Sequence, residues 1–280
     1  MMKLKPIVIA VASTLWLAGC QKAPETGNTN PAPAKQEQAS QSQSEQLAAF
    51  FDESFQTTLK QSPEYQSYLG IKWDYGSWDE QTDAAADKFF TRLKSELNTL
   101  SQFDDNALNT QEKLSKLIFE IDAQRQLSND EFRHHTYIMH QFRAFHTMVP
   151  SFLINIHRVS DQSDAEAYVS RLNGVDALFE QVIEQLRIRE KLGVFPPKWS
   201  YEQMIQASKN VIAGQPFSNT GEDSTIWADF KGKVEKLSIE QAAKDKLLEE
   251  AKQALLTSVQ PAYNKMIQEL GKHAQMTPEG

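Results

Sequence analysis

The chain has 280 residues, of which 40% are hydrophobic and 24% charged, so it has enough apolar residues for a sizeable core. Its formal net charge of -8 argues against nucleic acid as a partner, because sequence-independent binding requires a basic surface. The single cysteine excludes an internal disulfide framework and any zinc site built from several cysteines.

The first twenty residues have the pattern of a bacterial signal sequence. Two lysines precede an apolar stretch over 6–17, which is shorter than the ~20 residues that a membrane-spanning helix needs. The stretch ends in Leu-Ala-Gly-Cys, which resembles a lipobox. The resemblance implies a signal peptide over 1–19, cleavage between Gly19 and Cys20, and diacylglycerol on the Cys20 thiol. The alternative is an ordinary signal peptide with an incidental cysteine.

Residues 20–44 are predicted to be a lipidated cysteine followed by a flexible linker. The linker contains no large aliphatic or aromatic residue, so it cannot bury enough surface to offset its ordering entropy. Acyl chains such as palmitate on Cys20 would anchor the protein in a lipid bilayer. The next residue is Gln21 rather than aspartate, which resembles the sorting pattern of an outer-membrane lipoprotein facing the periplasm.

Apolar residues recur at helical spacing over 45–280, which predicts one all-α domain, a multi-helix bundle of about eight or nine helices. Two such stripes are Leu114, Leu117, Ile118, Ile121 and Ile138, Phe142, Phe145, Val149. We expect Pro150 to end or kink the second helix. Capping-box patterns predict further helix starts at Ser163, Ser200 and Ser238.

Motifs for catalysis and metal binding are missing from the sequence. It has no phosphate-binding glycine loop, no Gly-x-Ser-x-Gly and no His-Glu-x-x-His. The Glu131-x-x-His134 pair occurs once, whereas a di-iron site needs such a motif twice. We therefore predict no catalytic residue, no metal ligand and no cofactor in this chain. Trp73, Tyr75 and Trp78 could line a ligand site or simply cover the end of a bundle.

Several landmarks occur in an order that resembles one bacterial family. They are Ser62-Pro63-Glu64 with Leu69-Gly70, Gln141, His146, Pro150, Asp164 to Tyr168, Arg171-Leu172, Arg189-Glu190, Gly193, Pro196-Pro197, Gln215-Pro216-Phe217, Val259 and Pro261-Ala262-Tyr263. Together they resemble the N-terminal half of the domain of unknown function 885 family (DUF885). This resemblance runs from about residue 45 to 270.

The resemblance implies a relation to helical zinc metallopeptidases, many of them lipoproteins. The zinc-binding His-Glu-x-x-His of that family lies in its C-terminal half, and we expect this sequence to stop before that half begins. No zinc ligand or catalytic glutamate can therefore be carried over to this chain. Gln141 and His146 match a loop pattern of the family, where they either line the cleft that the other half completes or fix the turn at Pro150.

Two functional hypotheses follow. The first is a membrane-tethered periplasmic lipoprotein that forms the helical, non-catalytic half of a zinc metallopeptidase-like protein and is inactive by itself. Its partner would be the missing C-terminal half or another periplasmic protein, and zinc is expected only in complete family members. The second is a self-sufficient helical lipoprotein that acts as a binding or scaffold module. The sequence leaves open whether the chain belongs to an enzyme.

Overall fold

The computed structural model describes residues 42–142 and 144–278, which are helical and contain no β-strand. The helices in chain order are α1 (Gln43–Lys60), α2 (Pro63–Tyr68), α3 (Asp83–Leu100), η1 (Asp105–Ala107), α4 (Thr110–Asn129), η2 (Asp130–Phe132), α5 (Phe145–Asn155), α6 (Gln162–Asn173), α7 (Val175–Lys191), α8 (Lys198–Val211), α9 (Thr225–Glu235), α10 (Gln241–Ala254), η3 (Leu255–Val259) and α11 (Gln260–Met276). The all-α bundle predicted from the sequence is confirmed. None of the described helices is long and apolar enough to cross a bilayer.

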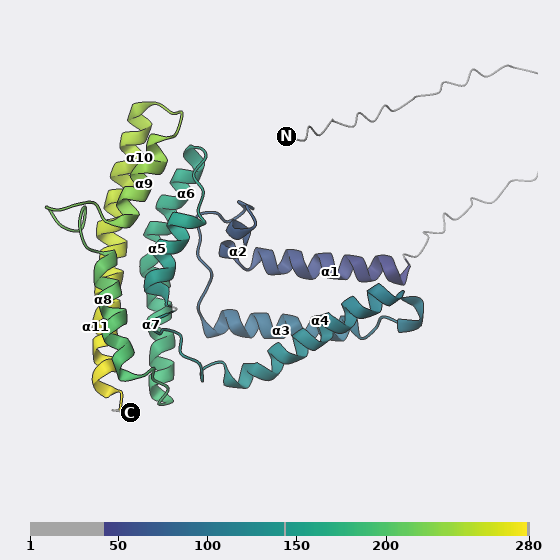
Figure 1. Ribbon diagram of the computed structural model, residues 1–280. Coiled ribbons are helices and arrows are strands. Elements are labelled where there is room, and N and C mark those ends of the chain that lie inside the picture. The colour runs from purple at the N-terminus through teal and green to yellow at the C-terminus, as the bar shows by residue number, and fades with distance from the viewer. Residues whose placement is uncertain (1–41, 143, 279–280) are drawn as a thin grey trace, which may run out of the picture. The chain divides into compact units, whose positions relative to one another are not determined.

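In the N-terminal helices, α1 to α4 (Figure 1), the helices α1, α3 and α4 share a small hydrophobic core. Its members are Leu47, Phe50, Phe51, Leu100, Phe103, Leu108 and Phe119. The phenylalanine rings meet mainly edge to face, with the centroids of Phe50 and Phe119 5.3 Å apart. Two capping boxes fix the helix starts, Ser42 with Glu45 at α1 and Asn109 with Glu112 at α4.

The apolar stripe of α4 lies on the outer face of its helix. Leu114, Leu117, Ile118 and Ile121 are 47%, 50%, 58% and 56% exposed. The opposite face of α4 supplies Phe119 and Ala123 to the interior instead. The predicted helix is therefore confirmed, but its strongest stripe does not contribute to the core of the described chain.

The C-terminal bundle, α5 to α11, holds the large core (Figure 1). On α7, Leu178, Phe179, Val182, Ile183 and Leu186 repeat every three or four residues, and each is at most 4% exposed. Full burial of each such side chain stabilises the fold by about 1.5–3 kcal/mol. Helix α11 packs against α7 and α8, which closes the bundle around this stripe.

A π-helical turn, η3, joins α10 to α11 without a break in the helix. Ser258 in this turn donates to the Asn173 carbonyl at 3.0 Å and accepts the Asp176 N–H at 3.1 Å. These two bonds hold the turn against the junction of α6 and α7. Pro261 lies directly after this turn, at the second position of α11.

The stretch 138–149 does not form one helix. Helix α5 begins only at Phe145, and the earlier Phe142 is 86% exposed. Pro150 lies inside α5 and does not end it. Its missing N–H would leave the His146 carbonyl without a partner, and the Tyr263 hydroxyl donates to that carbonyl at 2.7 Å.

The three capping boxes expected at Ser163, Ser200 and Ser238 are wrong. Helix α6 is capped two residues earlier by Asp161, whose carboxylate accepts the Asp164 N–H at 2.9 Å. Helix α8 starts after Pro197, so Ser200 lies within its first turn and donates to Gln141 instead. The cap position of α10 is held by Glu240 without a side-chain bond.

Candidate functional site

A cavity of about 1020 Å³ is hollowed into the described part of the chain. Its walls come from α1, α3, α5, α7 and the loops 74–82 and 133–138. Its charged and polar lining includes Asp79, Asp83, Arg92, Arg133, His134, Gln185 and Arg189, and its aromatic lining includes Trp78, Phe89, Phe90 and Phe145. A cavity with an apolar body and a few charged groups is suited to binding an organic ligand.

An aspartate–histidine pair lies on the wall of this cavity. Asp83 is the first residue of α3, and its Oδ1 lies 2.9 Å from His134 Nε2 and accepts from Gln185 Nε2 at 3.0 Å. Burial acts to raise the pKa of Asp83, but hydrogen bonds from His134 and Gln185 lower it overall. The carboxylate is therefore charged at neutral pH and orients the imidazole. Such a pair is a typical general acid–base arrangement.

Arg189 fixes the segment that carries His134. Its Nε donates to the Thr136 carbonyl at 2.7 Å and its Nη2 to the Arg133 carbonyl at 2.9 Å. Its Nη1 donates to both the carbonyl and the side chain of Gln185. Since these donors are engaged, Arg189 positions the cavity wall and is not free to bind a ligand.

Glu64, on α2 beside the cavity, has a strongly shifted pKa. Burial and the nearby charge of Asp79 raise the pKa of Glu64 to about 7, against opposing contributions from a backbone hydrogen bond and Arg171. Asp79 in turn accepts from the Ser62 hydroxyl at 2.5 Å and from the Glu64 N–H at 2.9 Å. A carboxyl that titrates near neutrality is a typical feature of functional sites, although structural clusters also produce it.

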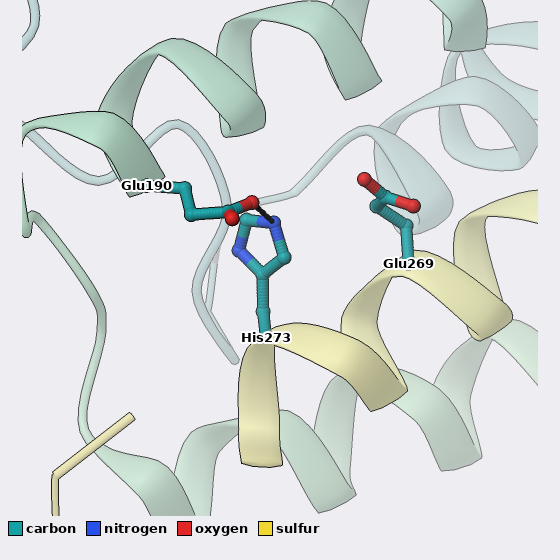
Figure 2. A group of neighbouring side chains, drawn as sticks. All are labelled: Glu190, Glu269 and His273. Carbon is teal, nitrogen blue, oxygen red and sulfur yellow. Dashed lines mark ion pairs between the residues drawn. The ribbon is translucent and has the colours of Figure 1, made fainter. Parts of the chain in front are cut away.

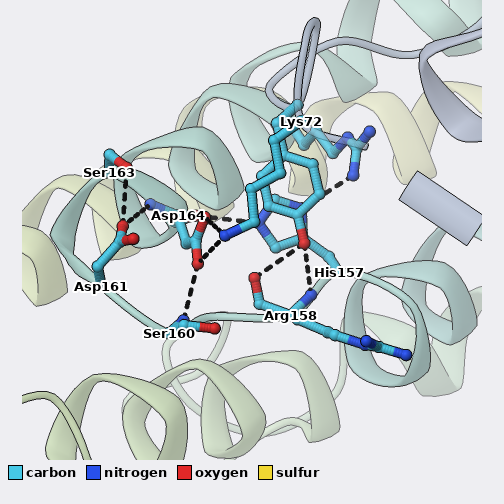
Figure 3. A network of polar contacts seen from close by, with 9 residues as sticks. Lys72, His157, Arg158, Ser160, Asp161, Ser163 and Asp164 are labelled. Atoms are coloured by element: carbon cyan, nitrogen blue, oxygen red, sulfur yellow. Dashed lines mark hydrogen bonds and ion pairs between the residues drawn. The ribbon is translucent and has the colours of Figure 1, made fainter. Parts of the chain in front are cut away.

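A second group of polar contacts surrounds Asp164, as Figure 3 shows. Asp164 is 1% exposed and accepts from Lys72 Nζ at 2.6 and 2.7 Å and from the Ser160 N–H at 2.8 Å. His157 Nε2 lies 2.9 Å from the Asp164 carbonyl. These bonds join the loop after α2 to the start of α6.

Arg171 is fully buried. Most of its hydrogen bonds go to residues 63–77. It donates to the carbonyls of Ser77 and Pro63, to the Ser67 hydroxyl and to His157 Nδ1. Because Nδ1 accepts, Nε2 of His157 carries the proton, and burial lowers the pKa of His157 to about 3. The family landmarks at 62–64 and 171 thus meet in one network that connects two parts of the fold.

The structure separates the residues that sequence patterns grouped together. Trp78 lines the cavity and donates to the Arg171 carbonyl at 2.8 Å, Tyr75 is buried beside His157, and Trp73 is 54% exposed. The trio is thus divided between the cavity, the buried network and the surface.

Gln141 and His146 do not line the large cavity, although Ala144, Phe145 and Met148 do. Gln141 accepts from the Ser200 hydroxyl at 2.8 Å. His146 is 1% exposed, both its ring nitrogens lack hydrogen-bond partners, and burial lowers its pKa to about 4. A role in a cleft that further chain would complete stays a prediction for both. Gly19 and Cys20 lie outside the described residues.

Sequence reasoning missed one group with the composition of a metal site. Glu190, Glu269 and His273 bring their donor atoms within 4.8 Å of one another (Figure 2). The spacing of Glu269 and His273, four residues apart on one helix, was a readable signal. Glu190 comes from another helix, so only the fold reveals it.

Comparison with known proteins identifies a family but no activity. The model of the family described as "Bacterial protein of unknown function (DUF885)" matches residues 63–279. No curated protein matches the chain. A solved structure of a "putative lipoprotein" from Colwellia psychrerythraea is similar, with a TM-score of 0.70, 18% identity, and coverage of 84% of this chain and 42% of that one.

A second solved structure, of a "putative lipoprotein of unknown function" from Shewanella oneidensis, has a TM-score of 0.56 and 15% identity. The match covers 85% of this chain and 38% of that one. At these identities the likeness establishes the fold alone. The matched region spans less than half the length of each neighbour.

Proposed function

Since this chain belongs to the bacterial DUF885 family, we propose that it is a lipid-anchored envelope protein whose helical body forms the non-catalytic half of a zinc metallopeptidase-like assembly. The lipobox ending at Cys20 supports the anchor, and Gln21 supports the outer membrane, facing the periplasm. In the complete assembly a zinc ion held by the other half would activate water and polarise a peptide carbonyl. The present chain would supply one wall of the substrate cleft and be inactive alone.

The exposed stripe of α4 is the observation that carries this proposal. Four large aliphatic residues share one helix face, and each is about half exposed (Leu114, Leu117, Ile118 and Ile121). A soluble protein rarely leaves such a continuous apolar face in water unless another surface covers it. The much greater length of both structural neighbours supports further polypeptide as the covering element.

The large cavity fits the role of a cleft wall. Its aromatic lining offers contacts for the apolar side chains of a peptide. The chain contains no His-Glu-x-x-His, so the other half would supply the hydrolytic chemistry.

The decisive experiment is to sequence the DNA beyond codon 280 and to co-express any reading frame found there that encodes His-Glu-x-x-His. We expect zinc-dependent peptide hydrolysis from the combination and none from this chain alone. Ile118→Lys in α4 should weaken the association, whereas Lys113→Ala on the same helix serves as the control. A locus without such a frame, or hydrolysis by the pure chain, would overturn the proposal.

The lipid anchor is tested separately. Cells that produce the full chain should incorporate labelled palmitate into it, and the protein should fractionate with the outer membrane. Cys20→Ser should abolish both the label and the membrane fractionation. Labelling that survives this substitution would contradict the anchor.

The alternative is a self-sufficient binding or scaffold lipoprotein. The observation in its favour is that residues of this chain alone enclose the cavity of about 1020 Å³. This function predicts that the isolated chain captures a ligand from periplasmic extract and that Trp78→Ala reduces the capture. The peptidase-half proposal predicts instead that retention of peptides requires the second polypeptide.

A further inference from the structure

Three side chains of metal-ligand type meet where α7 packs against α11, and none of them lines the large cavity. Glu269 and His273 are four residues apart on α11, so they share one face of that helix. Glu190 reaches them from the last turn of α7. One donor atom from each residue lies within 4.8 Å of the other two. Figure 2 shows the three side chains as neighbours.

The histidine of this group has a buried nitrogen without a hydrogen-bond partner. His273 is 2% exposed and Glu269 is 5% exposed. His273 Nε2 lies 3.1 Å from Glu190 Oε2, but it has no hydrogen bond of good geometry. In its neutral form an imidazole has a lone pair on one of its two ring nitrogens. A metal ion would satisfy a lone pair that is costly to leave unpaired.

Two cations already contact Glu269. Arg187 Nε donates to its Oε1 at 2.8 Å and Lys272 Nζ to its Oε2 at 3.2 Å. The side chains of Arg187 and Lys272 are 42% and 65% exposed, which leaves both room to move into solvent. A metal ion would therefore compete with them for one carboxylate.

We propose that Glu190, Glu269 and His273 bind one divalent transition-metal ion. One imidazole nitrogen and two carboxylate oxygens form a donor set that suits Zn²⁺ and disfavours Ca²⁺ and Mg²⁺, which prefer oxygen alone. Bonds of about 2.0–2.2 Å require the three side chains to close around the ion. A neighbouring cavity of about 500 Å³, lined by both glutamates, has room for water as a further ligand.

This site revises the expectation that the chain holds no metal ligand. That expectation rested on histidine spacing, and the proposed site uses only one histidine. The inference is independent of the proposed function, since it requires neither a second polypeptide nor the lipid anchor.

The test measures zinc retained after dialysis, in the full chain carrying Cys20→Ser so that no thiol binds the ion. We expect one Zn²⁺ per chain. Glu190→Gln and His273→Gln should each weaken binding about tenfold or more. The matched control is His135→Gln, because His135 is exposed and far along the chain from the site. Circular dichroism checks the fold of each variant, and if His273→Gln does not fold, Glu190→Gln decides.

The zinc affinity of Lys272→Ala distinguishes a metal site from a group of residues that only form ion pairs with one another. Without the Lys272 ammonium, which competes with the metal ion for Glu269, zinc should bind about fivefold more tightly. This factor corresponds to the interaction of two unit charges about 4 Å apart in water. Zinc affinity that is the same in the parent chain, Glu190→Gln and Lys272→Ala would overturn the proposal. A parent chain that retains no zinc would overturn it as well.

Discussion

The N-terminal helices and the C-terminal bundle use the same amphipathic pattern with different results. In the bundle, the stripe of α7 is covered by neighbouring helices, and Val182 and Ile183 are fully buried. In the N-terminal helices, the stripe of α4 is covered by nothing in the described chain, and Ile118 is 58% exposed. An apolar stripe thus indicates where a helix needs a partner, and not whether this chain supplies it.

The difference also separates the two regions energetically. The bundle has a core drawn from α5 to α11, whereas the N-terminal helices bury one small cluster around Phe50 and Leu100. Regions with few buried contacts open at lower free energy than a dense core. Polar bonds such as those of Arg171 and the Asp83–Gln185 pair then tie the weaker region to the stronger one.

The largest expected effect comes from removing the buried guanidinium that links the two regions. Arg171→Met should lower the free energy of unfolding by about 3–5 kcal/mol, because it leaves the Ser67 hydroxyl, His157 and two carbonyls without their donor. Urea denaturation measures the loss. Arg158→Met on the neighbouring loop is the control, and an equal loss there would contradict the link.

A matched pair of leucines compares the two cores directly. Leu172 in the bundle and Leu100 in the N-terminal cluster are 0% and 1% exposed. Leu172→Ala should cost about 3–4 kcal/mol of global stability and Leu100→Ala about 2–3 kcal/mol, because the smaller cluster can relax around the lost volume. Hydrogen exchange should show Leu100→Ala loosening α1, α3 and α4 only. Loosening of α7 to the same degree would break the comparison.

The two regions should also respond to pH in opposite directions. Glu64 has its pKa raised from 4.5 to about 7, so the folded state binds a proton that the unfolded state releases. Stability therefore falls as pH rises from 4.5 to 7, by up to about 3 kcal/mol. Urea midpoints across this range measure the effect. Glu64→Gln should flatten this part of the profile, and an unchanged slope would refute the assignment.

His146 in the bundle has the reverse dependence. Burial lowers its pKa from 6.5 to about 4, so the unfolded state binds the extra proton. Stability is complete above pH 6.5 and falls by up to about 3 kcal/mol as pH drops towards 4. His146→Leu should remove this contribution and leave that of the buried His157, whose pKa is lowered to about 3, whereas His135→Gln at the surface should retain both. An acid transition in His146→Leu as steep as that of the parent chain would contradict the assignment.

The smallest expected effect is on the outer face of α4. Ile118→Glu should change the free energy of unfolding by no more than about 0.5 kcal/mol, because the side chain is 58% exposed. Chemical denaturation of the isolated chain measures this. A loss above about 2 kcal/mol would mean that the stripe is covered within the chain alone.

The sequence predicts the helical class and most helix positions because periodicity and stop signals are local. Gly193, with φ of 71°, follows the C-cap of α7, a position where a glycine in the left-handed region commonly ends a helix. The capping boxes fail because Asp161 and Pro197 define the starts of α6 and α8 before the expected serines do. Local sequence patterns do not indicate which of several possible N-cap residues starts the helix.

The candidate sites were less accessible to sequence reasoning. The Asp83–His134–Gln185 contact joins residues from α3, a loop and α7. Tertiary packing brings these residues together, and no short spacing in the sequence indicates that they will be in contact. Arg171 and the residues at 62–64 were recognisable as landmarks of a family, but only the packed structure shows that they bond within one network.

The π-helical turn at Leu255–Val259 has a consequence for how relatives of this chain should be aligned. A π turn places one additional residue in the helix, and each residue of an α-helix advances the azimuth by about 100°. A register carried straight through from α10 would therefore assign the wrong face to α11. Relatives that lack the extra residue would present different side chains to α7, and a one-residue gap at this turn restores the correspondence.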